Sequence, residues 1–274
     1  MSHAPPCEIL NLGATRVAVA QTGNPDGPRV ICLHAVGHGM ADFWPLIARL
    51  GDRFRFILLD WPGHGESPAD ALPCDAKRYA EILNCLIDQL GDQPVILLGN
   101  SIGGAAAIIS AAARPARIRG LVLCNSGGLV PVSWMVRGFC RVMHWFFTAG
   151  MNGARWYPRA YSLYYRLVLP TAQVADRRQQ IVDQGQQCAR QLAEAWASFA
   201  TPAADLRSLA DKIRCPVWIA WARGDRVIPW MFVRAAVSGF TDHEISFFNG
   251  GHSAFMEDPD AFAQKLEAFV LRLA

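Results

Sequence analysis

The chain has 274 residues, of which 52% are hydrophobic and 18% are charged, so a large buried core is expected and extensive disorder is excluded. The net charge of +3 is too small to indicate a nucleic acid or an anionic membrane surface as a partner. The N-terminal residues lack the basic and then apolar segments of a secretion signal, so we expect a cytoplasmic protein.

The eight cysteines are scattered and contain no C-x-x-C pair. Cys32 and Cys124 lie inside apolar runs, which is typical of small buried side chains in a reducing compartment rather than of disulfides or zinc ligands. Metal-binding patterns such as H-E-x-x-H are also absent. We therefore expect neither a metal nor a cofactor.

The first predicted elements belong to a sheet. Polar and apolar residues alternate over 8–21 about Gly13, which predicts an antiparallel hairpin at a sheet edge. The continuous apolar run over 30–33 predicts a central strand buried on both faces. Residue spacing then predicts a helix over 43–50, a strand over 54–59 and an amphipathic helix over 75–90.

The stretch 94–113 has no charged residue and is long enough to span a membrane. Its interior instead predicts a buried strand over 95–98, a tight turn and a buried alanine-rich helix. Gly99 and Gly103 flank Ser101 with the G-x-S-x-G spacing of a nucleophile elbow. Such a strained strand-to-helix turn crowds the backbone, so only residues with little side chain fit beside the serine. Ser101 is therefore the candidate nucleophile.

The strand-and-helix alternation continues with a strand over 118–124 and indicates a mostly parallel sheet. From 127 to 213 no strand pattern occurs and aromatic residues are abundant, which predicts a helical lid inserted into the core domain of residues 1–126 and 214–274. Strands follow over 216–221 and 244–248, and a last helix begins near Asp258.

Parallel sheets present functional groups where their strands end. Asp225 follows the strand over 216–221, and His252 follows the strand over 244–248. An acid and a base are thus predicted at the same sheet edge as Ser101. Asn125 ends the strand after the elbow but cannot act as an acid, which favours Asp225 for that role.

Five motifs carry a resemblance to a known family: H-A-V-G at 34–37, D-W-P-G-H-G-E-S at 60–67, G-N-S-I-G-G at 99–104, G-D-R-V-I-P at 224–229 and G-G-H-S at 250–253. They resemble the motifs of α/β-hydrolases over nearly the whole chain outside 127–213. The resemblance implies an α/β-hydrolase fold, with a mostly parallel eight-stranded sheet, helices on both faces and a helical lid insertion. Within this superfamily the motifs are similar to those of meta-cleavage C–C hydrolases and related carboxylesterases. Ala35 replaces the glycine usual in the C–C hydrolases.

These residue types predict a serine hydrolase. A serine hydroxyl is a weak nucleophile at neutral pH, so His252 is expected to take its proton as general base. Asp225 is expected to hold the imidazole in the correct tautomer and to stabilise the imidazolium. The backbone N–H groups of Ile102 and Val36 are the expected donors of the oxyanion hole.

Other polar residues near these motifs have simpler expected roles. His34 and His64 are expected to orient their loops by hydrogen bonding, and Asp60 is expected to cap the turn that it opens. His38 is a candidate substrate contact.

The preferred hypothesis is a cofactor-independent hydrolase, monomeric or homodimeric, that cleaves an ester or related acyl bond of a small apolar substrate. The aromatic residues of 127–213 are expected mainly to pack their own helices and, as a group, to line an apolar pocket. That segment has ten basic and five acidic residues, which suits a substrate carboxylate and equally suits solvated helix faces.

Two alternatives remain open. One is C–C hydrolysis of a meta-cleavage-type dienoic acid, and the other is a non-catalytic ligand-binding or receptor protein on the same fold. A haloalkane dehalogenase is disfavoured, because those enzymes carry aspartate at the nucleophile position.

Overall fold

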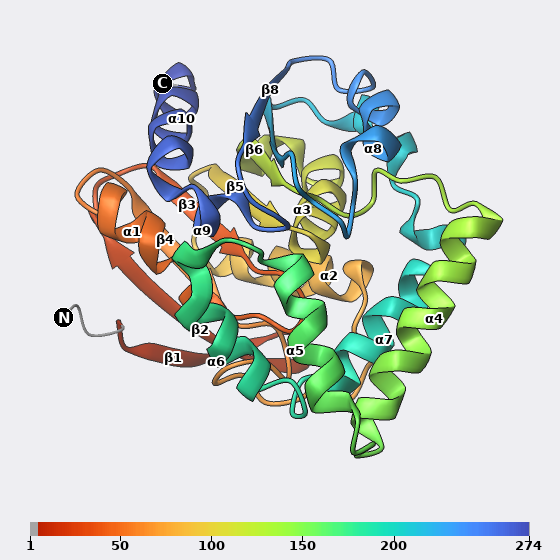
Figure 1. The fold of residues 1–274 in the computed structure, drawn as a ribbon. Coiled ribbons are helices and arrows are strands. Elements are labelled where there is room, and N and C mark those ends of the chain that lie inside the picture. The colour runs from red at the N-terminus through yellow and green to blue at the C-terminus, as the bar shows by residue number, and fades with distance from the viewer. Residues whose placement is uncertain (1–4, 274) are drawn as a thin grey trace.

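The computed structural model describes residues 5–273 and contains one eight-stranded sheet flanked by helices (Figure 1). The strand order is β1-β2-β4-β3-β5-β6-β7-β8. The strands are β1 (Cys7–Leu12), β2 (Thr15–Gly23), β3 (Arg29–Leu33), β4 (Arg55–Leu59), β5 (Val95–Asn100), β6 (Ile118–Cys124), β7 (Val217–Ala222) and β8 (His243–Phe248).

The antiparallel hairpin predicted at the sheet edge is confirmed. β1 and β2 pair antiparallel about a turn in which Gly13 has a φ of +66°. β2 also pairs antiparallel with β4, and every later pairing in the sheet is parallel. Parallel pairing needs crossover connections, which the intervening helices provide.

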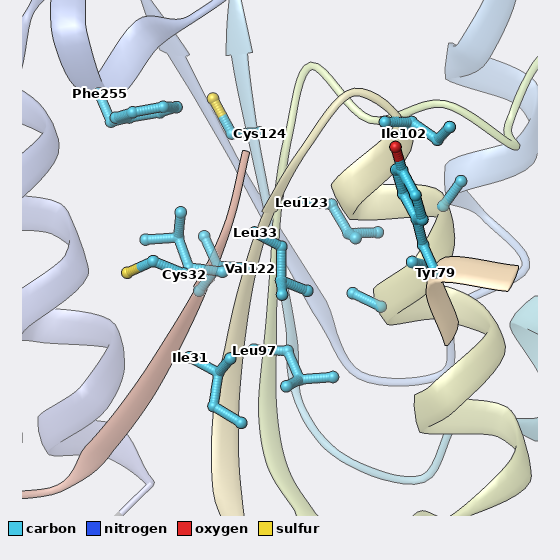
Figure 2. Packing of buried hydrophobic residues seen from close by; sticks show 14 of the residues in the cluster. Ile31, Cys32, Leu33, Tyr79, Leu97, Ile102, Val122, Leu123, Cys124 and Phe255 are labelled. Carbon is cyan, nitrogen blue, oxygen red and sulfur yellow. The ribbon is translucent and has the colours of Figure 1, made fainter. Parts of the chain in front are cut away.

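Helices cover both faces of the sheet. α1 (Trp44–Leu50), α9 (Ala254–Glu257) and α10 (Pro259–Arg272) contact one another on one face. α2 (Ala76–Gln89) packs against α3 (Ile102–Ala113) on the other. Figure 2 shows Phe255 of α9 on one side of the central strands and Tyr79 of α2 on the opposite side.

The core therefore consists of two apolar layers separated by the central strands. All six residues of β5 are buried, as are four of the five in β3, which explains their uninterrupted apolar sequences. Each layer contains a pair of stacked aromatic rings. Trp61 stacks on Tyr79 with ring centroids 4.1 Å apart, and Phe43 stacks on Phe255 at 4.7 Å.

Between β6 and β7 the chain forms helices and turns but, within the described residues, no strand. We call α4 to α7 and the short turns between them the helical segment. Its helices are α4 (Trp134–Met151), α5 (Tyr157–Val168), α6 (Ala175–Asp183) and α7 (Ala189–Phe199). Figure 1 shows them grouped together, in green to teal, outside the two layers that cover the sheet. The helical character expected of 127–213 is thus observed, whereas its division from the core as a lid domain stays a prediction.

Two helices were not predicted from the sequence. α8 (Trp230–Val237) follows the loop of Asp225, and α9 follows His252 directly. α9 has four residues, which is too short to show a helical period. The apolar stretch 94–113 forms β5 and α3, and none of the helices in the described part of the chain combines the length and apolarity needed to cross a bilayer.

Candidate active site

Ser101 lies at the turn between β5 and α3. Its φ of 54° and ψ of −119° fall outside the usual regions for a residue with a side chain. Its amide donates to the Cys124 carbonyl, 3.3 Å away, and its own carbonyl accepts from Gly127 at 2.9 Å. The end of β6 therefore holds the strained turn in place, and such strain is typical of functional sites.

The glycines beside Ser101 are required by close backbone approach. A Cβ on Gly99 would lie 2.6 Å from the carbonyl oxygen of Gly103. One on Gly103 would lie 2.4 Å from the carbonyl oxygen of Leu33 on β3, and one on Gly104 would meet the Ser126 hydroxyl at 2.3 Å. The steric reason given for the G-x-S-x-G spacing is confirmed by these contacts.

His252 and Asp225 are hydrogen-bonded to each other at the ends of neighbouring strands. Nδ1 of His252 lies 2.9 Å from Oδ2 of Asp225, and both residues are buried. Because a carboxylate accepts hydrogen bonds, Nδ1 carries the proton and Nε2 is left as the basic nitrogen. The Asp225 carboxylate also accepts from Asn125 Nδ2 at 2.7 Å and from the amides of Val227 and Ile228 at 2.8 and 3.0 Å.

Asn100, the residue before Ser101, connects the serine turn to the histidine loop. Its Nδ2 donates to the carbonyl of His252 at 2.9 Å and to that of Cys124 at 3.0 Å. Its Oδ1 accepts from the Ser253 hydroxyl at 3.0 Å. The three predicted loops are therefore joined through buried hydrogen bonds. Among residues 5–273 no hydrogen bond joins the Ser101 hydroxyl itself to His252.

The amides named for the oxyanion hole are unpaired. Neither the Val36 N–H nor the Ile102 N–H has an acceptor among the described residues. The neighbouring amides are occupied, because Gly37 N–H donates to His64 Nε2 at 2.8 Å and His38 N–H donates to the Ala35 carbonyl at 3.2 Å. Both amides predicted to form the oxyanion hole therefore remain free to donate.

His34 and His64 orient loops, as predicted. His34 accepts from the Trp61 amide at 2.9 Å, and His64 accepts from Gly37. Both rings are buried, and burial lowers the pKa of His64 to about 4 and that of His34 well below its usual value. Both are therefore neutral at pH 7 and serve as acceptors.

Asp60 caps a turn, as predicted. Its carboxylate accepts from the amides of Met40 at 2.7 Å and Glu66 at 3.2 Å. Burial raises the pKa of this carboxyl to about 6, although both amide hydrogen bonds oppose the rise.

His38 makes a buried pair that the sequence did not indicate. Its Nδ1 lies 2.6 Å from Oδ2 of Asp42, and Oδ1 of Asp42 accepts from Nε of Arg177 on α6 at 2.7 Å. Burial alone would raise the pKa of Asp42, but the facing His38 and Arg177 hold it well below its usual value. The pair ties the 34–39 loop to the helical segment.

Glu257 is a second residue that the sequence analysis missed. Its carboxylate accepts from the amide of Gly251 at 2.6 Å and from that of Thr171 at 3.2 Å. Burial raises the pKa of this carboxyl, although these hydrogen bonds oppose the rise. It joins α9 to the histidine loop and to the turn that follows α5, and no local pattern marks a lone glutamate in a four-residue helix.

The helical segment touches the histidine loop directly. The His252 amide donates to the carbonyl of Val168, the last residue of α5, at 2.8 Å. A Cβ on Gly251 would lie 2.3 Å from the same oxygen, so only glycine permits this approach. The ring of Tyr165 on α5 also lies 5.7 Å from that of His38. α5 therefore lies next to the candidate site.

The aromatic residues of the helical segment do not all face inward. Phe147, Tyr157, Tyr161 and Tyr165 are buried as expected. Trp134, Trp145, Phe139 and Trp156 instead expose 83%, 64%, 47% and 42% of their surface, although the ring of Phe139 still packs on Trp196 and that of Trp156 on Phe146. Helices α4 and α5 carry apolar residues on more than one face, so an aromatic residue type alone does not show that its side chain is buried.

The described residues contain no group of three or more His, Cys, Asp or Glu side chains placed to hold a metal ion. All eight cysteines are free, and seven of them are buried or half-buried. Burial raises the pKa of the Cys124 thiol to about 12, so it stays protonated at neutral pH.

Comparison with known proteins shows the same architecture. The sequence profile of the "Alpha/beta hydrolase family" matches residues 30–265. The chain is 28% identical to a pimeloyl-(acyl-carrier protein) methyl ester esterase of Stenotrophomonas maltophilia, over 90% of this chain and 95% of that protein. It is 27% identical to a 2-hydroxy-6-oxononadienedioate/2-hydroxy-6-oxononatrienedioate hydrolase of Pseudomonas putida, over 85% and 84%. Among solved structures, an esterase from Exiguobacterium antarcticum superposes with a TM-score of 0.84 at 20% identity, over 97% of this chain and 99% of that one.

Proposed function

Because the chain belongs to the alpha/beta hydrolase family, we propose that it is a serine hydrolase that cleaves a carboxylic ester of a small apolar substrate. The observation that carries the proposal is the buried hydrogen bond between His252 and Asp225, on a loop that Asn100 ties to the Ser101 turn. The relative named as a methyl ester esterase supports an ester as the substrate class.

In the proposed mechanism the Ser101 hydroxyl oxygen attacks the ester carbonyl while Nε2 of His252 takes its proton. The developing oxyanion accepts hydrogen bonds from the Val36 and Ile102 amides. The imidazolium, stabilised by Asp225, then protonates the departing alcohol and leaves an acyl-serine. Water then attacks the acyl-serine while His252 takes its proton, and His252 returns a proton to the Ser101 oxygen as the acid is released. Each proton that leaves an oxygen returns to one, so no cofactor is required.

We further propose that residues 127–213 form a lid over a core domain of residues 1–126 and 214–274. The contacts of Val168 with His252 and of Arg177 with Asp42 support this role, because they place α5 and α6 against the loops of the site. A cytoplasmic location and a monomeric or homodimeric state remain predictions.

Replacing Ser101 by alanine tests the nucleophile. We expect Ser101→Ala to lower kcat for p-nitrophenyl butyrate hydrolysis by roughly 10⁶-fold, since nucleophile removal has effects of this order. Circular dichroism should remain unchanged, because only a hydroxyl is lost. Ser110→Ala is the matched control: this serine is buried in α3, the helix that follows Ser101, and its hydroxyl has no hydrogen-bond partner among the described residues.

Labelling with a fluorophosphonate, followed by peptide mapping, gives an independent readout. A label on the peptide that contains Ser101 supports the proposal. A label on another serine, or full activity in Ser101→Ala, excludes this nucleophile. A labelled but unproductive protein across an ester panel favours the binding or receptor alternative.

A second candidate is C–C bond hydrolysis of a dienoic acid. It is favoured by the Pseudomonas putida relative, whose name describes hydrolysis of a hydroxy-oxo-dienedioate. The two candidates share the nucleophile and differ in substrate. Loss of the dienoate chromophore at a higher kcat/KM than for aryl esters would select this candidate, and no loss would exclude it.

A further inference from the structure

Helix α4 presents a second apolar face to solvent. Its core side is formed by Cys140, Met143 and Phe147. On the opposite side Trp134, Val142 and Trp145 expose 83%, 60% and 64% of their surface. Figure 1 shows α4 as the outermost helix on its side of the molecule. Three large apolar side chains on one outward helix face are unusual for a protein surface and mark an interaction site.

This face continues onto α5. The exposed rings of Trp145 and Trp156 stack with centroids 5.7 Å apart. Trp156 then lines a surface hollow together with Arg155, Arg159, Ala160 and Leu163, and Leu163 is 61% exposed. We call the surface made by Trp134, Val142, Trp145, Trp156 and Leu163 the aromatic face.

The charged side chains of the chain segment that forms the aromatic face are all arginines. Residues 127–175 contain five arginines and no aspartate or glutamate. Arg137 and Arg141 are exposed on α4, Arg155 is exposed in the turn before α5, and Arg159 is exposed in the first turn of α5. Within the part of the chain that the structure describes, none of these four guanidinium groups forms an ion pair. The surface therefore combines exposed tryptophans with uncompensated positive charge.

We propose that the aromatic face and its four arginines dock on an anionic phospholipid surface. Tryptophan rings are favoured at the boundary between headgroups and acyl chains, and each arginine near an anionic bilayer adds to the attraction. The helices would lie on the bilayer rather than cross it. The net charge of +3 gave no indication of an anionic membrane as a partner, because acidic residues outside 127–175 offset the arginines of this segment in the total.

Charge also argues against a second copy of this chain as the occupant. A two-fold interface places the same patch of both subunits together. Arginines would then face arginines with no carboxylate from 127–175 to pair with them. An anionic lipid surface neutralises the same charges.

Vesicle co-sedimentation tests the proposal with the whole chain. The vesicles are phosphatidylcholine alone, and phosphatidylcholine mixed with phosphatidylglycerol at a ratio of three to one. We expect binding to the mixed vesicles only, weakened by salt. Arg137→Gln combined with Arg141→Gln should weaken it about thirty-fold, because each basic residue contributes about a factor of five or more. Trp134→Ser combined with Trp145→Ser should abolish sedimentation.

Matched variants on other surfaces serve as controls. Met231→Ser with Phe232→Ser removes exposed apolar side chains from α8, and Arg16→Gln with Arg234→Gln removes two exposed charges elsewhere. Both should bind vesicles as the wild type does. Ser101→Ala should also bind normally, so failure of the proposed catalysis leaves this result unaffected.

Three results would overturn the proposal. They are no binding to either vesicle, equal binding by the α4 variants and the wild type, and a dimer in light scattering that the α4 variants dissociate while vesicles bind nothing. The last result would assign the aromatic face to self-association.

Discussion

Gly103 shows how one residue type can be dictated by backbone packing. Gly103 lies in α3 so close to β3 that a Cβ at this position would be only 2.4 Å from the carbonyl oxygen of Leu33. A carbonyl within a central parallel strand cannot move without disturbing the ladder on both sides. The requirement for glycine thus comes from the sheet, and it supports the turn that holds Ser101.

We expect Gly103→Ala to lower the free energy of unfolding by about 3 kcal/mol, the upper range for overpacking a rigid site. Gly138→Ala provides the contrast, because a Cβ there meets nothing within 4 Å and the residue lies inside exposed α4. That change should raise the free energy of unfolding by about 0.5–1 kcal/mol. Urea unfolding measures both, and a Gly103→Ala variant as stable as the wild type would contradict the close approach.

At the scale of elements, the ion pair between Arg177 and Asp42 joins α6 to the 34–39 loop, because Asp42 also binds His38 of that loop. Asp42 is fully buried between His38 and Arg177, and the Arg177 side chain is 18% exposed. A buried carboxylate that loses a charged partner keeps its desolvation penalty without compensation. The helical segment is therefore held to the site by a contact that is costly to break.

Arg177→Met should lower the free energy of unfolding by about 2–3 kcal/mol, somewhat below the usual cost for a fully buried pair. Arg190→Met is the matched control. Arg190 lies on α7, its side chain is 69% exposed and its partner Glu194 lies one turn away, so a loss of about 0.3–0.5 kcal/mol is expected. Equal losses in the two variants, measured by urea unfolding, would show that the Asp42 pair contributes no more than a surface contact.

At the scale of the whole molecule, two buried titratable groups make the free energy of unfolding depend on pH in opposite directions. The pKa of His64 is lowered from 6.5 to about 4 by burial, so the unfolded chain binds more protons in that window and stability rises with pH through it. The pKa of Asp60 is raised from 3.8 to about 6 by burial, so the folded chain binds more protons there and stability falls as pH rises. The two effects partly cancel between about pH 4 and 6.

Asp60→Asn should remove the part of the pH dependence in which the free energy of unfolding falls as pH rises. Its free energy of unfolding should rise with pH between 4 and 6 more steeply than that of the wild type, by at most about 1.4 kcal/mol per pH unit. Asp260→Asn is the control, since that carboxyl is largely exposed. Unfolding curves recorded across this range give the slopes, and parallel slopes for Asp60→Asn and the wild type would contradict the opposing roles.

Much of the molecule could be predicted from the sequence alone. Strand and helix alternation and the edge hairpin follow from local periodicity, and Gly99 follows from the backbone sterics of its own turn. The order of Ser101, Asp225 and His252 at strand ends follows from the same alternation, because parallel strands end at one edge of a sheet. These features need no knowledge of which distant residues meet.

The tertiary structure alone decided the contacts that hold the site together. Asn100 with His252, Glu257 with Gly251 and Arg177 with Asp42 join residues that no local pattern links. It also decided that Trp134, Val142 and Trp145 of α4 face solvent, because residue type alone does not distinguish these apolar side chains from the buried ones of the same helix. Local rules specify elements, whereas packing between distant segments selects the face of each element that is buried and the polar groups that meet there.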